Sequence, residues 1–188
     1  MRYSCAMSQP DIAFAAEALH HARQSAEWAG LRFSSEATAL RAVRNDKPEK
    51  NESSLAAGAM CEVLVDGQFG YAATADVSGP GLQRAFDRAV ATTRATSAHK
   101  AHRFSALQRP ALQGSYQSPR SQPLDALSLA EISDCLRAAS AAMQGPAQLV
   151  NRSARAITVR TELAYLTSSG ADIRQCFEMV DIELSATA

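Results

Sequence analysis

Histidines and cysteines, four of each, are the first candidates for chemistry in this sequence. His99 and His102 are three positions apart, a spacing that would place both imidazoles on one face of a helix. A zinc site would need further ligands, and neither a nearby carboxylate pattern nor a C-x-x-C pair supplies them. We therefore favour a solvated helix end over a metal site. His20 and His21 are adjacent and point to different helix faces, so they cannot chelate one ion together.

Nucleophile and phosphate-binding signatures are also missing from the sequence. It contains no H-E-x-x-H, G-x-S-x-G or P-loop pattern. Cys61 lies in a strand-like run with no histidine near it in sequence, which favours a buried core thiol over a catalytic one. We assign no catalytic and no metal-binding residue to this chain and expect it to be inactive alone. A small independent enzyme that uses Cys61 or the His99/His102 pair remains one alternative.

Size and composition are those of an ordinary globular protein. The 188 residues suffice for one core or two small subdomains, and 46% of them are hydrophobic. Lys plus Arg equals Asp plus Glu at 19 each, so electrostatics give no support to direct nucleic-acid contact. No apolar run is long enough for a membrane span, and no signal peptide is recognisable. We expect a cytoplasmic protein with reduced cysteines, most of them buried.

The elements that would position these side chains follow from periodicity and turn residues. Helical spacing predicts a helix over residues 11–29, which Gly30 would end. Alternation predicts strands over 31–34, 38–44 and 58–65, a turn at 45–48 and an edge strand over 49–54. Asp66-Gly67, followed by the apolar run 68–72, is typical of a tight β-hairpin.

The second half of the chain alternates between helix and strand signals. Ser78-Gly79-Pro80 predicts a helix that runs to about residue 97, and Ser128 with Glu131 predicts a capping box that begins another, ending before Gly145. Residues 98–127 are interrupted by prolines and are expected to be irregular or to contain short strands, while 148–188 are strand material. The fold class is α+β, a largely antiparallel sheet with about three helices packed on it. The chain would be one domain, with a possible subdivision into 1–97 and 128–188.

Two stretches are more distinctive than their periodicity. Residues 58–78 combine a glycine-led strand, a D-G hairpin, an aromatic strand with G-Y-A-A-T and a D-V-S helix start, and residues 165–175 combine a tyrosine, S-S-G and a strand. Together they resemble the N-terminal domain of the TldD/PmbA family. The residues that carry the resemblance, expected to act as a structural motif, are Gly58, Asp66, Gly67, Gly70, Tyr71, Thr74, Asp76, Ser169 and Gly170.

The resemblance implies the chemistry of a metal-dependent peptidase. Family members act on unfolded or modified peptides and are also called modulators of DNA gyrase. Their ligands for a divalent metal, expected to be zinc, lie in a C-terminal domain around an H-E-x-x-x-H helix and a later cysteine. This chain stops at Ala188, before that domain, so no ligand can be assigned to it. It also has Met60-Cys61-Glu62 where the family commonly has a small residue, valine and arginine.

Two roles are therefore open for this chain. The first is the non-catalytic N-terminal domain of a TldD/PmbA-like peptidase, which helps to form the substrate path and a homo- or heterodimer with a family subunit. The second is a stand-alone or inactive partner subunit that acts as a binding or assembly module. Both roles imply a C-terminal metallopeptidase domain and unfolded peptides as partners, with neither direct nucleic-acid nor membrane contact.

Overall fold

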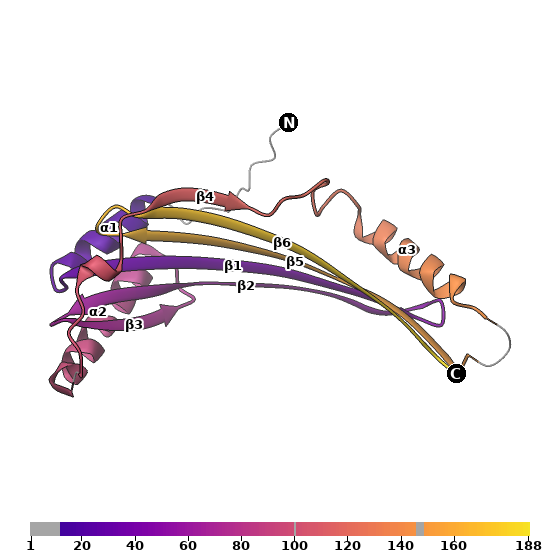
Figure 1. Cartoon of the computed structure of the whole chain (residues 1–188), viewed down its shortest axis with the longest axis horizontal. Coiled ribbons are helices and arrows are strands. Elements are labelled where there is room, and N and C mark those ends of the chain that lie inside the picture. Colours follow the sequence, from indigo (N-terminus) through magenta and orange to yellow (C-terminus); the bar gives the residue numbers. More distant parts are fainter. Residues whose placement is uncertain (1–11, 100, 146–148) are drawn as a thin grey trace. The chain divides into compact units, whose positions relative to one another are not determined.

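In the part of the chain that the structure describes, six strands form a sheet and three α-helices accompany it (Figure 1). The computed structural model describes residues 12–99, 101–145 and 149–188. The described elements are α1 (Ile12–Arg23), β1 (Trp28–Arg44), β2 (Lys47–Val65), β3 (Gln68–Thr74), α2 (Gly79–Thr96), β4 (Gln113–Gln117), α3 (Leu129–Ala142), β5 (Asn151–Thr167) and β6 (Asp172–Thr187). The strand order is β3-β2-β1-β5-β6-β4, with β2 and β3 antiparallel and β4 parallel to β6. The predicted α+β class is confirmed.

The chain divides into two compact units, each built from separate stretches of sequence. Unit 1 extends up to Ser35 and includes Ala57–Gln117 and Glu162–Cys176, whereas unit 2 consists of Glu36–Ala56, Ser118–Thr161 and Phe177–Ala188. The strands β1, β2, β5 and β6 each contribute residues to both units. The units are therefore not continuous along the sequence, unlike the predicted subdivision into 1–97 and 128–188.

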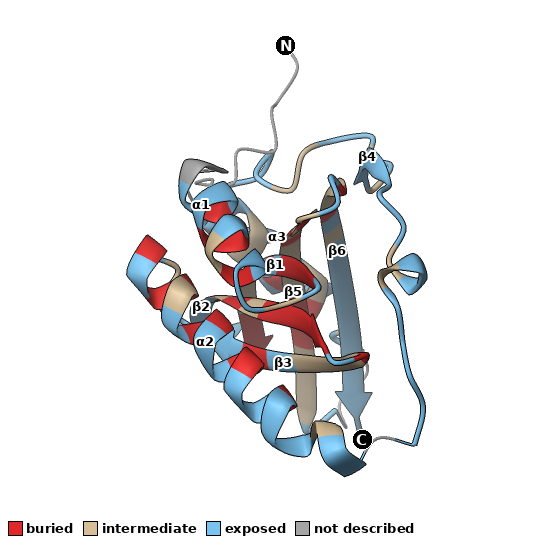
Figure 2. Cartoon of the chain, turned by 90° about the vertical axis from the view of Figure 1, so that its left-hand side faces the viewer, coloured by how far each residue is buried: buried red, intermediate tan, exposed pale blue. Residues whose placement is uncertain are grey.

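Unit 1 holds the larger core, between α1, α2 and one face of the sheet. Alternate residues of β1 and β2 point into it, because successive side chains of a strand face opposite sides. Buried residues line α2 and the strands behind it (Figure 2). The core includes Ala15, Ala18, Leu19 and Ala22 of α1, Leu82, Ala85, Phe86, Ala89 and Val90 of α2, and Leu31, Phe33, Cys61, Val63 and Val65 of the sheet. The residues between these core positions on each strand face the opposite side of the sheet.

The predicted hairpin between β2 and β3 is confirmed. Asp66 and Gly67 both have positive φ, at 51° and 73°, as the tight turn requires. Helix α2 then packs so closely on β3 that a Cβ added at Gly70 would lie 1.5 Å from Thr93 Oγ1. Glycine is thus needed at residue 70 for the approach of the helix and not for its backbone angles.

The prediction of a helix over 11–29 is wrong at its C-terminal end, and its proposed start lies outside the described residues. Helix α1 ends at Arg23, and β1 begins at Trp28. Gly30 lies within the strand, where a Cβ would lie 2.6 Å from the Trp28 ring. Alternating burial at Ala29, Leu31 and Phe33 stabilises the strand, so tertiary packing outweighs the helical spacing of the alanines.

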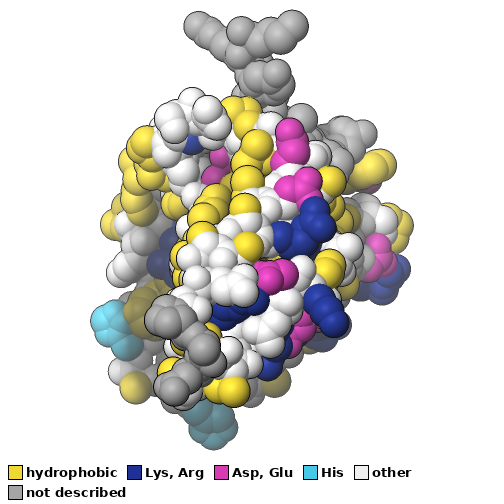
Figure 3. All heavy atoms as spheres, turned by 90° about the vertical axis from the view of Figure 1, so that its right-hand side faces the viewer, with side chains coloured by type: hydrophobic (Ala, Val, Ile, Leu, Met, Phe, Trp, Pro, Cys, Tyr) yellow, Lys and Arg dark blue, Asp and Glu magenta, His cyan; other side chains and the backbone are white. Residues whose placement is uncertain are grey.

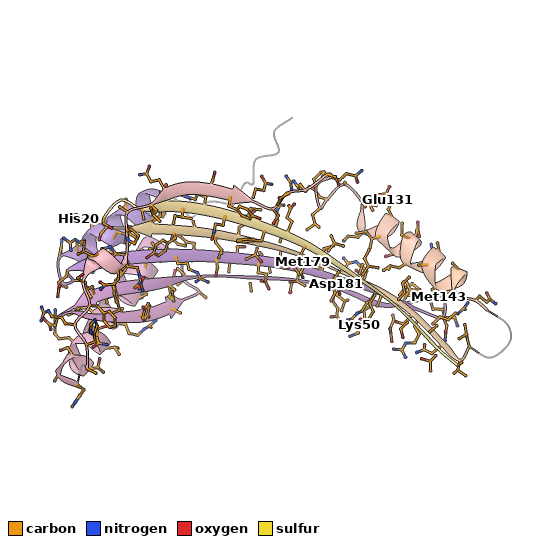
Figure 4. All side chains as sticks on the ribbon, in the orientation of Figure 1. His20, Lys50, Glu131, Met143, Met179 and Asp181 are labelled. Atoms are coloured by element: carbon orange, nitrogen blue, oxygen red, sulfur yellow. The ribbon has the colours of Figure 1, made fainter. Side chains whose placement is uncertain are left out.

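Unit 2 holds a smaller core beneath α3. The predicted capping box is confirmed, since Glu131 N donates to Ser128 Oγ at 3.2 Å and Ser128 N donates to Glu131 Oε2 at 2.7 Å. Glu131 and Met143 mark the two ends of this helix (Figure 4). Its buried Leu136 packs in a cluster with Val43, Ala154 and Ala156.

The remaining predictions differ from the structure in length and detail. The strand 49–54 is part of the longer β2, and the strand material after residue 148 forms just two long strands, β5 and β6, within the described part of the chain. The irregular stretch 98–127 contains the short strand β4 and two 3₁₀ turns, Ser97–His99 and Ala106–Gln108, of which the first overlaps its start. Among the described residues, no helix is both long and apolar enough to cross a bilayer.

Candidate functional site

The sheet face of unit 1 opposite α1 and α2 carries a pocket of about 480 Å³. The strands β1, β2, β3, β5 and β6 all contribute side chains, and the connection after α2 contributes one more. The lining residues are Arg32, Met60, Glu62, Tyr71, Arg109, Leu163, Tyr165, Ile173 and Gln175. The volume falls in the usual range for small-ligand pockets, about 300–1,000 Å³. Because all lining residues belong to unit 1, the pocket is a feature of that unit alone.

A carboxylate buried at the base of this pocket is paired with an arginine from the connection. The side chain of Glu62 is 5% exposed, and its Oε1 accepts hydrogen bonds from Arg109 Nε at 3.0 Å and Nη2 at 2.6 Å. The Arg109 guanidinium also lies 4.4 Å from the centre of the Phe69 ring, within cation–π range. The hydrogen bond to Glu62 raises the pKa of Arg109, so the guanidinium stays charged. The ion pair therefore holds the connection against the sheet.

Two phenols complete the polar network and remain neutral at ordinary pH. Tyr165 Oη donates to Glu62 Oε2 at 3.3 Å, and Tyr71 Oη accepts from Arg109 Nη2 at 3.3 Å. Burial and the neighbouring Glu62 carboxylate raise the pKa of Tyr165 to about 12. Burial is also the main cause that raises the pKa of Tyr71. Each hydroxyl therefore keeps its proton, and neither is suited to act as a base near neutral pH.

Arg32 and Gln175 are the polar groups of the pocket without a partner. Neither side chain makes a hydrogen bond or ion pair with another described residue. The pocket contains two guanidinium groups, at Arg32 and Arg109, and one carboxylate, at Glu62, which leaves one net positive charge. Met60, Leu163 and Ile173 add apolar surface beside it. The arrangement can bind a singly charged anion with an apolar part, and it has no nucleophile next to a base.

The motif residues between β2 and α2 fix the local backbone. Asp76 Oδ1 accepts from Ser78 N at 3.1 Å and from Ser78 Oγ at 2.6 Å, and its Oδ2 pairs with Arg84 at 2.6 Å. The pKa of Asp76 is lowered, and the hydrogen bonds from Ser78 are the main cause. Asp76 N in turn donates to Thr74 Oγ1 at 3.0 Å. A Cβ added at Gly58 would lie 2.9 Å from the Thr74 carbonyl oxygen. These contacts join the end of β3 to the N-terminus of α2.

The second group of motif residues lies in the turn between β5 and β6. Ser169 Oγ accepts from Trp28 Nε1 at 3.1 Å, and Ser168 Oγ accepts from Ala29 N at 3.0 Å. Gly170 has φ of 96°, which a side chain would disfavour. Of all the motif residues, Tyr71 is the one that lines the pocket. The other motif residues belong to the same unit but do not line the pocket.

The histidines and Cys61 are placed away from any shared site. His99 ends a 3₁₀ turn, whereas His102 stacks edge-on against Phe104 at 4.8 Å, so the two do not share a helix as their spacing suggested. His21 Nε2 lies 2.8 Å from Asp87 Oδ1 and joins α1 to α2. No cluster of three or more potential metal ligands occurs among the described residues. The Cys61 thiol faces the core, and burial raises its pKa to about 12, so it is protonated.

Sequence reasoning missed the pocket, although one signal pointed to it. Glu62 is the only charged residue in the run 59–65, where a buried strand would be apolar throughout. Its partner Arg109 is 47 positions away, in a stretch without periodicity. Arg32 and Gln175 look like ordinary outward-facing strand residues, and nothing in the sequence shows that they share a pocket.

Comparisons with known proteins agree with this fold. Residues 29–93 match the family model described as PmbA/TldA metallopeptidase domain 1. No curated protein matches the sequence. A structure of a proposed modulator of DNA gyrase from Thermotoga maritima covers 94% of this chain with a TM-score of 0.72 at 12% identity. A protein of the same description from Bacteroides thetaiotaomicron covers 95% with a TM-score of 0.67 at 14% identity.

A third solved structure, TldE from Thermococcus kodakarensis, covers 92% of the chain with a TM-score of 0.64 at 10% identity. This chain spans 40% of the length of the two gyrase-modulator structures and 39% of TldE, so it corresponds to less than half of each. The predicted resemblance to the TldD/PmbA family is therefore confirmed: residues 29–93 match the first domain of that family, and nearly the whole chain has the fold of these solved structures.

Proposed function

We propose that this chain serves as the non-catalytic N-terminal domain of a TldD/PmbA-like metallopeptidase that acts on unfolded or modified peptides. The observation that carries the proposal is the match of residues 29–93 to the first domain of that family, supported by the shared fold. In this proposal the divalent metal, zinc, is held by the family's C-terminal domain. This chain would help to form the substrate path and the contacts of a dimer.

The sheet of unit 2 offers an edge to which an extended peptide could pair. Strand β4 pairs with β6 from Asp172 to Cys176, and beyond that point no further strand is paired with the outer side of β6 in the described part of the chain. Strand β6 is exposed over most of its later length (Figure 2). Its exposed apolar residues in unit 2 are Phe177, Met179, Val180, Ile182 and Leu184. Main-chain pairing along such an edge binds peptides with little regard to sequence.

The opposite edge of unit 2 differs in a way that favours β6 as the binding edge. The first part of β2 reads KPEKNESS, and charged residues and proline protect an edge strand from further pairing. On β6, the residues from Phe177 onwards contain no proline, and their acidic residues Glu178, Asp181 and Glu183 lie between exposed apolar ones. Figure 3 shows apolar, acidic and basic side chains interleaved on the side of the chain that it depicts. The two edges thus differ in their capacity to accept another strand.

The test joins this chain to a family C-terminal metallopeptidase domain and measures cleavage of an unfolded peptide. The joined protein is expected to cleave faster than the C-terminal domain alone. Ile182→Lys is expected to slow the cleavage, because it removes an exposed apolar side chain from β6 and introduces lysine, which protects edge strands from further pairing. Ser54→Lys, at an exposed position on β2, is the matched control and should not. Equal rates for the joined protein and the C-terminal domain alone would contradict the proposal.

The alternative role of an inactive partner subunit makes a different prediction in the same assay. This chain would then bind a full-length family subunit in a stable complex, as measured by analytical ultracentrifugation. Its joining to a C-terminal domain would leave cleavage unchanged.

A further inference from the structure

We propose that the pocket of unit 1 binds the C-terminal end of a peptide, with Arg32 holding its free carboxylate and the apolar wall holding its last side chain. This inference rests on the proposed function, since it names the part of the peptide that the domain would recognise. It concerns the pocket on the sheet face of unit 1 and is independent of the β6 edge in unit 2.

The charges of the pocket select a single carboxylate. The Arg109 guanidinium is committed to Glu62 through two hydrogen bonds, so it adds no free charge. Arg32 lines the same pocket and has no partner among the described residues. A guanidinium pairs with a carboxylate through two parallel hydrogen bonds, the geometry that arginine favours. One uncompensated positive charge matches a carboxylate better than a phosphate dianion.

The positions of the polar groups place such a ligand over β5. Arg32 comes from β1 and Gln175 from β6, the two strands that flank β5. Adjacent strands are about 4.8 Å apart, so the two strands that carry these residues are separated by about 10 Å. The strand between them, β5, contributes Leu163 and Tyr165 to the same pocket. A ligand over β5 can therefore reach the guanidinium on one side and the Gln175 amide on the other.

The apolar wall explains why the last residue of a peptide fits better than an acidic side chain. Met60, Leu163 and Ile173 line the pocket together with Arg32. In a C-terminal residue with an apolar side chain, the carboxylate and the apolar group are attached to the same carbon atom. An aspartate or glutamate within a chain has its charge at the tip of its own side chain and no apolar group there. One terminal residue thus supplies both features that the pocket presents.

The experiment measures binding of a short alanine peptide that ends in leucine, labelled with fluorescein at its N-terminus, by fluorescence anisotropy. The full chain is used, and the peptide is supplied with a free C-terminal carboxylate or with a C-terminal amide. A third peptide has the amide and a glutamate before the leucine, and so tests an acidic side chain as the source of the charge. We expect the free acid to bind about tenfold more tightly than either amide, because it alone forms a charge-assisted pair.

Substitution of the arginine completes the test. Arg32→Gln should weaken binding of the free acid about tenfold and leave the amide unchanged. Arg44→Gln is the matched control, because Arg44 is an exposed arginine on the same strand, outside the pocket. Arg32 is exposed, so the variant is expected to keep the circular dichroism spectrum of the native chain.

The possible results separate this inference from the proposed function. Equal binding of the free acid and the amide, or an Arg32→Gln variant that binds the acid as tightly as the native chain, would overturn the carboxylate assignment and leave peptide binding in place. Preferential binding of the amidated peptide with glutamate would replace the terminal carboxylate by an acidic side chain. Failure to bind any of the three peptides would overturn the inference, whereas the cleavage assay of the joined protein would still decide the proposed function.

Discussion

Replacement of Arg109 by glutamine should destabilise unit 1 by about 2 kcal/mol. The side chain of Glu62 is 5% exposed and would lose both hydrogen bonds from the guanidinium. Removal of one partner from a fully buried ion pair costs about 3–5 kcal/mol. Arg109 itself is 33% exposed, so water can replace part of the lost interaction. The expected cost is therefore nearer to that of a hydrogen bond to a charged group, about 1.5–3 kcal/mol.

Urea unfolding followed by tryptophan fluorescence measures this cost. Trp28 is the only tryptophan of the chain, and its ring lies 5.9 Å from that of Phe69, on which the Arg109 guanidinium rests. The matched control is Arg103→Gln, which removes the same charge from the same connection, at a residue without an ion pair among those described. The control should change the free energy of unfolding by less than about 0.5 kcal/mol.

The double variant distinguishes a true pair from two independent residues. Glu62→Gln combined with Arg109→Gln should cost about 1 kcal/mol less than the sum of the single changes, since no charge is then left without its partner. A cost for Arg109→Gln no larger than that for Arg103→Gln would show that the ion pair with Glu62 does not stabilise unit 1. Additive single changes would lead to the same conclusion.

Three further changes test other parts of the fold. In a Cys5→Ser background, a thiol reagent at mildly alkaline pH should label the exposed Cys135 quickly and Cys61 only on unfolding, because burial raises the pKa of Cys61 to about 12. Equal labelling rates of Cys61 and Cys135 in the native chain would contradict the buried position of Cys61. Ser128→Ala should lower the free energy of unfolding by about 1 kcal/mol in urea titrations, through loss of the α3 cap, and an unchanged value would argue against the capping box. The folded-state pKa of Asp76 is lowered, so its contribution to stability is present above its unfolded-state pKa and is lost as pH falls through the folded value. An Asp76→Asn variant should therefore lose less stability than the native chain when the pH is lowered. An equal loss of stability in the two proteins, measured by urea unfolding at a series of acidic pH values, would count against this role.

Local signals in the sequence were sufficient for those elements that depend on local chemistry. The positive φ angles at Asp66 and Gly67 and the reciprocal cap of Ser128 and Glu131 each involve residues close in sequence. Turn and cap residues report such geometry directly, so the hairpin and the start of α3 could be predicted. The end of α1 could not, because strand pairing of residues after Trp28 depends on distant parts of the chain.

The candidate site depends almost entirely on long-range contacts. Arg109 meets Glu62 across 47 positions, and Tyr165 meets Glu62 across 103. The strand order β2-β1-β5-β6 brings Arg32 and Gln175 to the two sides of β5, although they are far apart along the chain. Periodicity shows which face of a strand a residue occupies, but not which strands become neighbours. The charge of Glu62 in an apolar run was the available signal, and it gave no indication of its partner.

In the proposed function, this chain supports a peptidase without containing the catalytic centre. The most direct test measures zinc content and cleavage of an unfolded peptide for this chain alone and for the chain joined to a family C-terminal metallopeptidase domain. We expect neither stoichiometric zinc nor cleavage for the chain alone, and both for the joined protein, with cleavage faster than that of the C-terminal domain by itself. Zinc-dependent cleavage by the chain alone would contradict this proposal.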